Sequence, residues 1–161
     1  MFRTFLATTA AALMLSSAGY AGPQLVQKIE VTIALDAIQN PKAAAHWITL
    51  PADLNAAILL RLGNQLVDSG ARIQIDLSHV ELANTFQETL GIADSKLEGT
   101  VVVRNGDSDL EMRRYGLTVS FVDAGPFFPE GTDLQALKSD SPEYYRAMVN
   151  AFADRVVSNL N

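Results

Sequence analysis

The chain has 161 residues, no cysteine, 12 basic and 18 acidic side chains, and a formal net charge of −6. This length suffices for one domain with its own hydrophobic core, which must be stable without disulfides. The acidic residues are scattered rather than gathered in blocks, and such a surface repels nucleic acid and anionic membranes. We therefore expect no nucleic-acid partner.

The first 21 residues have the pattern of a Sec-type signal peptide. Arg3 precedes an apolar run over residues 5–15, and the small residues Gly19 and Ala21 stand at the two positions that a signal peptidase reads. Cleavage is expected after Ala21. The run is too short for a stable membrane anchor. The sequence therefore predicts a periplasmic or secreted protein whose mature part, residues 22–161, is a single domain.

The first half of that domain has one strand pattern and one helix pattern. Apolar and polar residues alternate over residues 29–35, which predicts a half-buried strand. Apolar residues then recur at helical spacing from Pro51 to about Asp68, which predicts the main helix. Gly70 follows at the place where a left-handed C-cap is expected.

Three strand patterns come next. Residues 72–77 alternate cleanly, but the phase changes at Ser78-His79, which requires a bulge, a bend or the end of the strand. Residues 97–103 predict another strand, and Asn105-Gly106 is a strong turn signal. The last strand pattern covers residues 110–121, with a second irregularity near Arg113-Arg114.

A closing helix is predicted from Pro142, because Ser141 can cap it and Glu143 places an acidic residue in the first turn. Its expected apolar stripe is Tyr145, Met148, Val149, Phe152, Val156 and Leu160. The complete order, β-α-β-β-β-α, predicts a two-layer α+β fold with both helices on one face of a four-stranded sheet. The sheet should be mostly antiparallel, and the helix between the first two strands also allows a parallel pair there.

The segment Pro126–Pro129 places two phenylalanines, Phe127 and Phe128, between prolines. If these rings pack down, they close one end of the sheet against Trp47 or the closing helix. If they are exposed, they form a docking patch for a partner or a lipid. Trp47 itself is expected to be a core anchor or, less commonly, the wall of a ligand site. These three aromatic residues are candidate binding residues.

His79 is the fourth candidate binding residue, because it stands at the phase change near Asp76 and Glu81. It could be a metal ligand or a proton carrier, but a bulge histidine satisfied by backbone or water is the favoured interpretation. A zinc site needs three or four ligands, and the two histidines of this cysteine-free chain show no ligand spacing. We assign no catalytic residue, no metal site and no cofactor.

Catalytic motifs are also missing from the chain. There is no G-x-S-x-G elbow, no phosphate-binding glycine loop and no dinucleotide fingerprint. An enzyme is therefore the less favoured interpretation.

The β-α-β-β-β-α order behind a signal peptide resembles small periplasmic proteins that accompany lipid transporters. Examples are the auxiliary lipoproteins of ABC-type lipid transport and the plug lipoprotein of lipopolysaccharide transport. The chain also resembles exported proteins of Gram-negative bacteria. The lipoproteins carry a lipidated cysteine after the signal, whereas this chain has no cysteine. The resemblance implies a fold and an accessory role in the envelope, and it assigns no role to any residue.

The leading hypothesis is a non-enzymatic periplasmic binding or accessory protein of the cell envelope, whose partner is an envelope protein or an apolar small molecule. The alternative is a small hydrolase or metal-dependent enzyme centred on His79 with Asp76 or Glu81. A third hypothesis is a subunit that completes its sheet at an exposed edge strand.

Overall fold

The computed structural model describes residues 23–33, 48–81, 96–108, 110–138 and 141–161. The signal pattern and Trp47 lie outside these residues. The described elements are β1 (Val26–Ile33), α2 (Leu50–Leu62), the 3₁₀ helix η2 (Gly63–Gln65), β2 (Ala71–Glu81), β3 (Lys96–Arg104), β4 (Glu111–Ser120), α4 (Phe121–Ala124), the 3₁₀ helix η3 (Gly125–Phe127) and α5 (Pro142–Ser158).

The strands form one sheet in the order β1-β2-β3-β4. β1 and β2 pair in parallel because the chain crosses over through α2 between them, whereas β2, β3 and β4 are antiparallel. The predicted α+β class, element order and mixed sheet are therefore confirmed.

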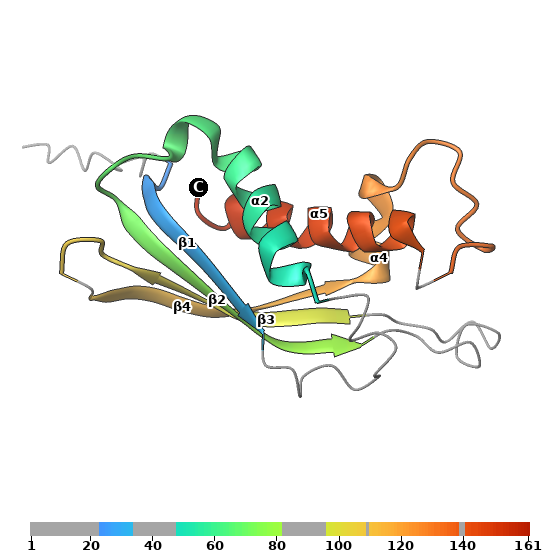
Figure 1. Cartoon of the computed structure of the whole chain (residues 1–161), viewed down its shortest axis with the longest axis horizontal. Coiled ribbons are helices and arrows are strands. Elements are labelled where there is room, and N and C mark those ends of the chain that lie inside the picture. Colours follow the sequence, from blue (N-terminus) through green and yellow to red (C-terminus); the bar gives the residue numbers. More distant parts are fainter. Residues whose placement is uncertain (1–22, 34–47, 82–95, 109, 139–140) are drawn as a thin grey trace, which may run out of the picture.

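Both long helices lie on one face of the twisted sheet, as predicted (Figure 1). α2 contacts β1, α5 contacts β3 and β4, and the two helices pack against each other. The core lies between the layers, where Leu54, Ile58, Ile75 and Phe152 have no exposed surface. Each such side chain contributes roughly 1.5–3 kcal/mol by leaving water, so this contact holds the two layers together.

The phase change in β2 is a β-bulge within a continuous strand. Leu77 is opposite Gly99 and His79 is opposite Glu98, so Ser78 is the extra residue. The bulge keeps Val80 on the helix side, where it is buried. Of the three outcomes allowed by the pattern, the strand adopts the bulge.

The hairpin between β3 and β4 begins at the predicted Asn105-Gly106 turn. Asn105 Oδ1 accepts hydrogen bonds from the backbone N–H groups of Asp107 (3.0 Å) and Ser108 (3.1 Å). A side chain at Gly106 would lie 2.0 Å from the carbonyl oxygen of Gly70, so only glycine fits this approach.

The irregularity in β4 falls beside the predicted arginine pair. Val103 is opposite Arg113 and Arg104 is opposite Glu111, so Met112 is the extra residue. The predicted end of this strand is wrong, because Phe121 starts α4. The cause is local: Ser120 and Asp123 form a capping box that ends the strand and begins the helix.

The predicted end of the main helix is also wrong. α2 ends at Leu62 rather than near Asp68, and its C-cap is Gly63, at a φ of 48° that favours glycine. Gly70 is not a left-handed cap. It is needed for close packing, because a Cβ there would lie 2.8 Å from the carbonyl oxygen of Leu25.

The start of α5 agrees with the sequence. Ser141 Oγ accepts a hydrogen bond from the N–H of Tyr144 at 3.2 Å, and Pro142 opens the helix. One residue of the predicted stripe differs: Tyr144 is the buried tyrosine, and Tyr145 is only half-buried. The side chain of Tyr145 points toward α2, where its hydroxyl donates a hydrogen bond to the carboxylate of Asp53.

Candidate functional site

The structure packs Phe127 and Phe128 against the helix layer. The Phe128 ring lies 5.6 Å from the Phe121 ring and 6.3 Å from the Tyr144 ring, measured between centroids. The guanidinium of Arg61 on α2 lies 6.0 Å from the centre of the Phe127 ring. Both phenylalanines are half-buried and contact the hydrophobic core. Of the two arrangements that the sequence allowed, this is the packed one, against α5 and α2.

His79 and Asp76 lie on β2, and the structure gives them different neighbours. His79 is the cross-strand neighbour of Glu98. Asp76 accepts hydrogen bonds from the hydroxyl of Thr32 and, at 3.2 Å, from the amide of Gln74. The side chain of Glu81 lies outside the described residues. Within the described part of the chain, no three His, Asp or Glu side chains come together as a metal site would require.

A polar cluster joins the first turns of α2 and α5. Asp53 Oδ2 accepts hydrogen bonds from Tyr145 Oη at 2.5 Å and from Thr49 Oγ1 at 2.7 Å. Burial and the hydrogen bond to Asp53 raise the pKa of Tyr145 well above its ordinary value, so the phenol remains a proton donor at neutral pH. The cluster therefore acts as a clasp between two helices.

The outer face of α2 is the surface whose chemistry the fold does not explain. Its exposed residues are Ala52, Ala56, Leu59 and Leu60, which we call the α2 outer face. Their spacing places them on one side of the helix, away from the buried Leu54 and Ile58. Leu60 is 85% exposed. A covering helix ordinarily presents polar residues on this side, so the apolar surface suggests an interaction site.

α5 provides the internal comparison. It covers the same sheet face, and its exposed residues are Pro142, Arg146, Asp154, Arg155 and Ser158. The outer surface of α5 is thus mainly charged or polar, whereas that of α2 is entirely apolar. Because the two helices share one layer, packing against the sheet does not account for this difference.

The sequence interpretation missed Leu59 and Leu60. The predicted apolar stripe was Leu54, Ala57, Ile58, Leu62 and Leu66. Its first four members are buried on α2, whereas Leu66 lies beyond the helix and is 38% exposed. The residues on the opposite side of the helix were not considered. A usable signal was present, because Leu50–Leu62 contains only three polar residues, Asp53, Asn55 and Arg61. A helix with so few polar residues cannot keep its solvent side polar, whichever face is buried.

Among the described helices, none combines the length and apolar character needed to cross a bilayer.

No family model matches the sequence, and no curated protein matches it. Solved structures do resemble it. The DUF330 protein XCC0632 from Xanthomonas campestris has a TM-score of 0.52 at 12% identity, with 88% of each chain covered. A minor lipoprotein from Acinetobacter baumannii has a TM-score of 0.46 at 11% identity, covering 85% of this chain and 90% of its own. The protein CT253 from Chlamydia trachomatis has a TM-score of 0.46 at 8% identity, covering 85% and 98%.

The similarity to XCC0632 extends over most of both chains, so the two proteins share a fold. At this sequence identity the similarity carries no information about shared residues or shared chemistry. The comparison therefore establishes the architecture, and the function must be argued from the surfaces of this chain.

Proposed function

We propose that this chain is a non-enzymatic accessory protein of the cell envelope that binds a partner protein through the α2 outer face. The observation that supports this role is the exposed apolar surface of α2 in a chain with a net charge of −6. Exposed contiguous apolar surface commonly marks a protein interaction site. The proposal combines that surface with the signal pattern of residues 1–21.

The shape of the site favours a protein over a small molecule. Sites for small molecules are concave and enclose most of the ligand, whereas the outer side of a surface helix is convex. A convex ridge with Leu60 at its crest suits a groove or a second apolar helix on another protein. The phenylalanines of Pro126–Pro129 are half-buried, so we propose that they support this helix layer and contribute little to docking.

A charge placed on the ridge tests the docking proposal. Leu60→Glu should abolish capture of the envelope protein that the wild-type chain retains, because docking would then bury an unpaired carboxylate. Leu110→Glu is the matched control, since Leu110 is also exposed, at 68%, but lies in the β3–β4 connection. Equal capture by the wild type and Leu110→Glu, with loss in Leu60→Glu, supports the proposal.

Equal capture by Leu60→Glu would overturn the assignment of this face. Sedimentation of the purified protein separates a further possibility. If the wild type is a dimer and Leu60→Glu is a monomer, the surface joins two copies of this chain, and the proposed partner protein is wrong.

The envelope location has its own test. Expression of the full chain in a Gram-negative host, followed by mass spectrometry of the periplasmic fraction, should give a protein that begins at Gly22. Uncleaved protein confined to the cytosol would contradict both the location and the accessory role.

A further inference from the structure

Three cations lie side by side across the sheet face that points away from α2 and α5. Lys28 on β1 is opposite Arg72 on β2, and Arg72 is opposite Arg104 on β3. Neighbouring strands are about 4.8 Å apart, so this cation row extends over about 10 Å. Like charges directly opposite each other on neighbouring strands destabilise a sheet. The fold does not need this arrangement, because other polar residues would satisfy a solvent-facing position equally well.

A bulge in β1 creates the row. Val26 is opposite Ala71, and the next pair is Lys28 with Arg72, so Gln27 is the extra residue. Without that bulge Gln27 would face Arg72, and the row would be one cation shorter. The irregularity thus places a positive charge where regular pairing would place a neutral amide.

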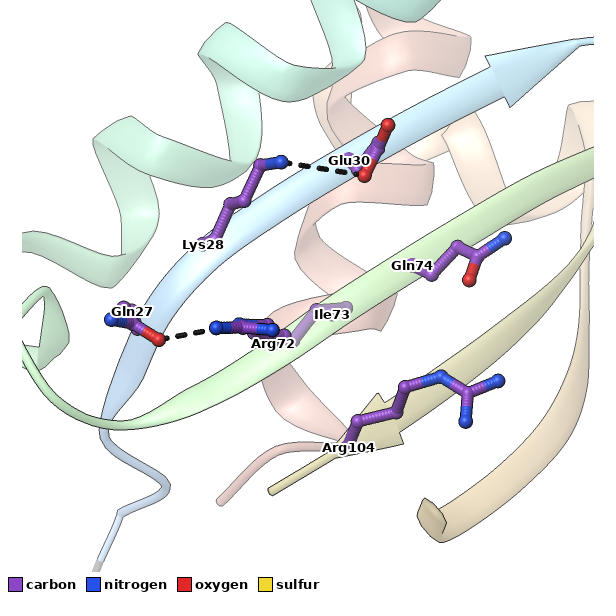
Figure 2. Close-up of a pocket in the computed structure, with 7 residues that line it drawn as sticks. All are labelled: Gln27, Lys28, Glu30, Arg72, Ile73, Gln74 and Arg104. Carbon is purple, nitrogen blue, oxygen red and sulfur yellow. Dashed lines mark hydrogen bonds and ion pairs between the residues drawn. The ribbon is translucent and has the colours of Figure 1, made fainter. Parts of the chain in front are cut away.

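The charged ends of the three side chains lie apart from one another (Figure 2). Lys28 Nζ is 3.5 Å from Glu30, Arg72 Nε donates to Gln27 Oε1 at 3.4 Å, and Arg104 turns the other way. This divergence is what mutual repulsion produces. Lys28 and Arg72 are exposed and Arg104 is partly exposed, and long side chains at a protein surface change rotamer within nanoseconds. They can therefore turn toward a shared ligand.

The carboxylates beside Lys28 and Arg104 neutralise these two cations incompletely. Glu111 lies 3.8 Å from Arg104, but it is held more closely by Arg114, at 2.8 Å. The ion pair of Lys28 with Glu30 has more than half of each side chain exposed, and such pairs contribute little. Between these side chains lies a depression of about 780 Å³, lined by Gln27, Lys28, Glu30, Arg72, Ile73, Gln74 and Arg104.

We propose that the cation row binds a short oligoanion, a ligand with two or three linked phosphate or carboxylate groups. Arginine suits both groups, because its planar fork of N–H donors matches their oxygen atoms. The row length of about 10 Å suits two or three linked anionic groups. The inference concerns a different face from the α2 outer face and does not depend on the proposed function.

The surroundings limit the length of the ligand. Farther along the strands the same face carries Asp76 and Glu98, and the whole chain has a net charge of −6. A long polyanion such as nucleic acid would extend beyond the cation row over a chain of net negative charge and be repelled. The charge pattern therefore favours a compact ligand.

Calorimetric titration of the purified protein with sodium tripolyphosphate, and separately with citrate, tests the proposal at about 0.15 M sodium chloride, where weak surface attraction is screened. The wild type should show saturable binding at one site. Arg72→Gln and Arg104→Gln should each weaken it about tenfold, the effect of losing one hydrogen bond to a charged group. Arg146→Gln, an exposed arginine on α5, is the matched control and should bind like the wild type.

The two probes also separate the sources of the anionic groups. Binding of both supports a site for oligoanions in general, and binding of tripolyphosphate alone supports a site for phosphate groups. Failure of both to bind would overturn the proposal. So would equal weakening in Arg146→Gln, because that result would mean diffuse attraction rather than a site. Circular dichroism should show that all three variants are folded.

Discussion

Tyr145 Oη on α5 donates a hydrogen bond of 2.5 Å to Asp53 Oδ2 on α2. This bond joins the first turns of the two helices that cover the sheet. Tyr145→Phe removes this bond and leaves the ring in place. We expect a loss of about 1 kcal/mol in the free energy of unfolding, because a hydrogen bond to a charged group contributes more than a neutral one and partial exposure reduces it. Urea unfolding measures the loss, and an unchanged midpoint would show that the clasp is dispensable.

The same tyrosine predicts sensitivity to alkali. Burial and the hydrogen bond to Asp53 raise the pKa of Tyr145, and burial also raises the pKa of Tyr115. A tyrosine whose pKa is higher in the folded protein than in the unfolded chain stabilises the fold. This contribution is complete below the unfolded pKa of about 10 and declines as the pH rises above it. The urea midpoint should therefore be lower at about pH 11 than at about pH 7, with the decline setting in at about pH 10. The fall should be smaller in Tyr145→Phe, and an equal fall would exclude this tyrosine as a cause.

Phe128→Ser should destabilise the protein. The ring lies among Phe121 and Tyr144, and replacing a partly buried aromatic ring by a small polar group costs about 2 kcal/mol. Val122→Ser is the control, since Val122 is 81% exposed and its change should be nearly neutral. Thermal unfolding compares the two variants. A Phe128→Ser protein as stable as the wild type would favour the docking alternative for Pro126–Pro129.

Substitution of two apolar residues of α2 should change the stability of the protein to very different extents. Leu60→Glu should change the free energy of unfolding by no more than about 0.5 kcal/mol, because this side chain is already in water. Ile58→Ala should cost about 3 kcal/mol, because Ile58 has no exposed surface. Denaturant titration gives both values. A large loss in Leu60→Glu would mean that the α2 outer face stabilises the fold and is not reserved for docking.

The cation row makes a prediction that needs no ligand. Arg72→Gln removes the central charge and should raise the melting temperature by a few degrees at most, because the repulsion from Lys28 and Arg104 disappears. The increase should shrink as sodium chloride is added, since salt screens that repulsion in the wild type. A lower melting temperature in Arg72→Gln would show that the row stabilises the sheet.

Local chemistry explains why much of the architecture could be predicted. The alternation of apolar residues in strands and their helical spacing in helices depend on neighbouring residues, and so does the cap at Ser141. These features can therefore be recognised along the chain. The end of α2 was predicted wrongly because Gly63 and Gly70 are both plausible caps by composition. In the structure Gly63 caps the helix, whereas Gly70 lies against the backbone of Leu25. The end of β4 was missed because the period of two continues through Phe121, and the capping box at Ser120 overrides it.

The candidate sites were less predictable than the fold. Leu60 could have been noticed from the composition of its helix, but its exposure depends on which side of α2 faces the sheet. The neighbours of Lys28 could not be read from the sequence, because Arg72 and Arg104 lie far along the chain and a bulge sets the pairing.

The sequence by itself determined the order of strands and helices, the change of phase in β2 at Ser78 and the net acidity of the chain, because each depends on local periodicity or on composition. Only the tertiary structure decided that Lys28, Arg72 and Arg104 form one row and that α2 presents leucines to solvent. Register and layer orientation are properties of the whole sheet: one extra residue at Gln27 changes which charges become neighbours.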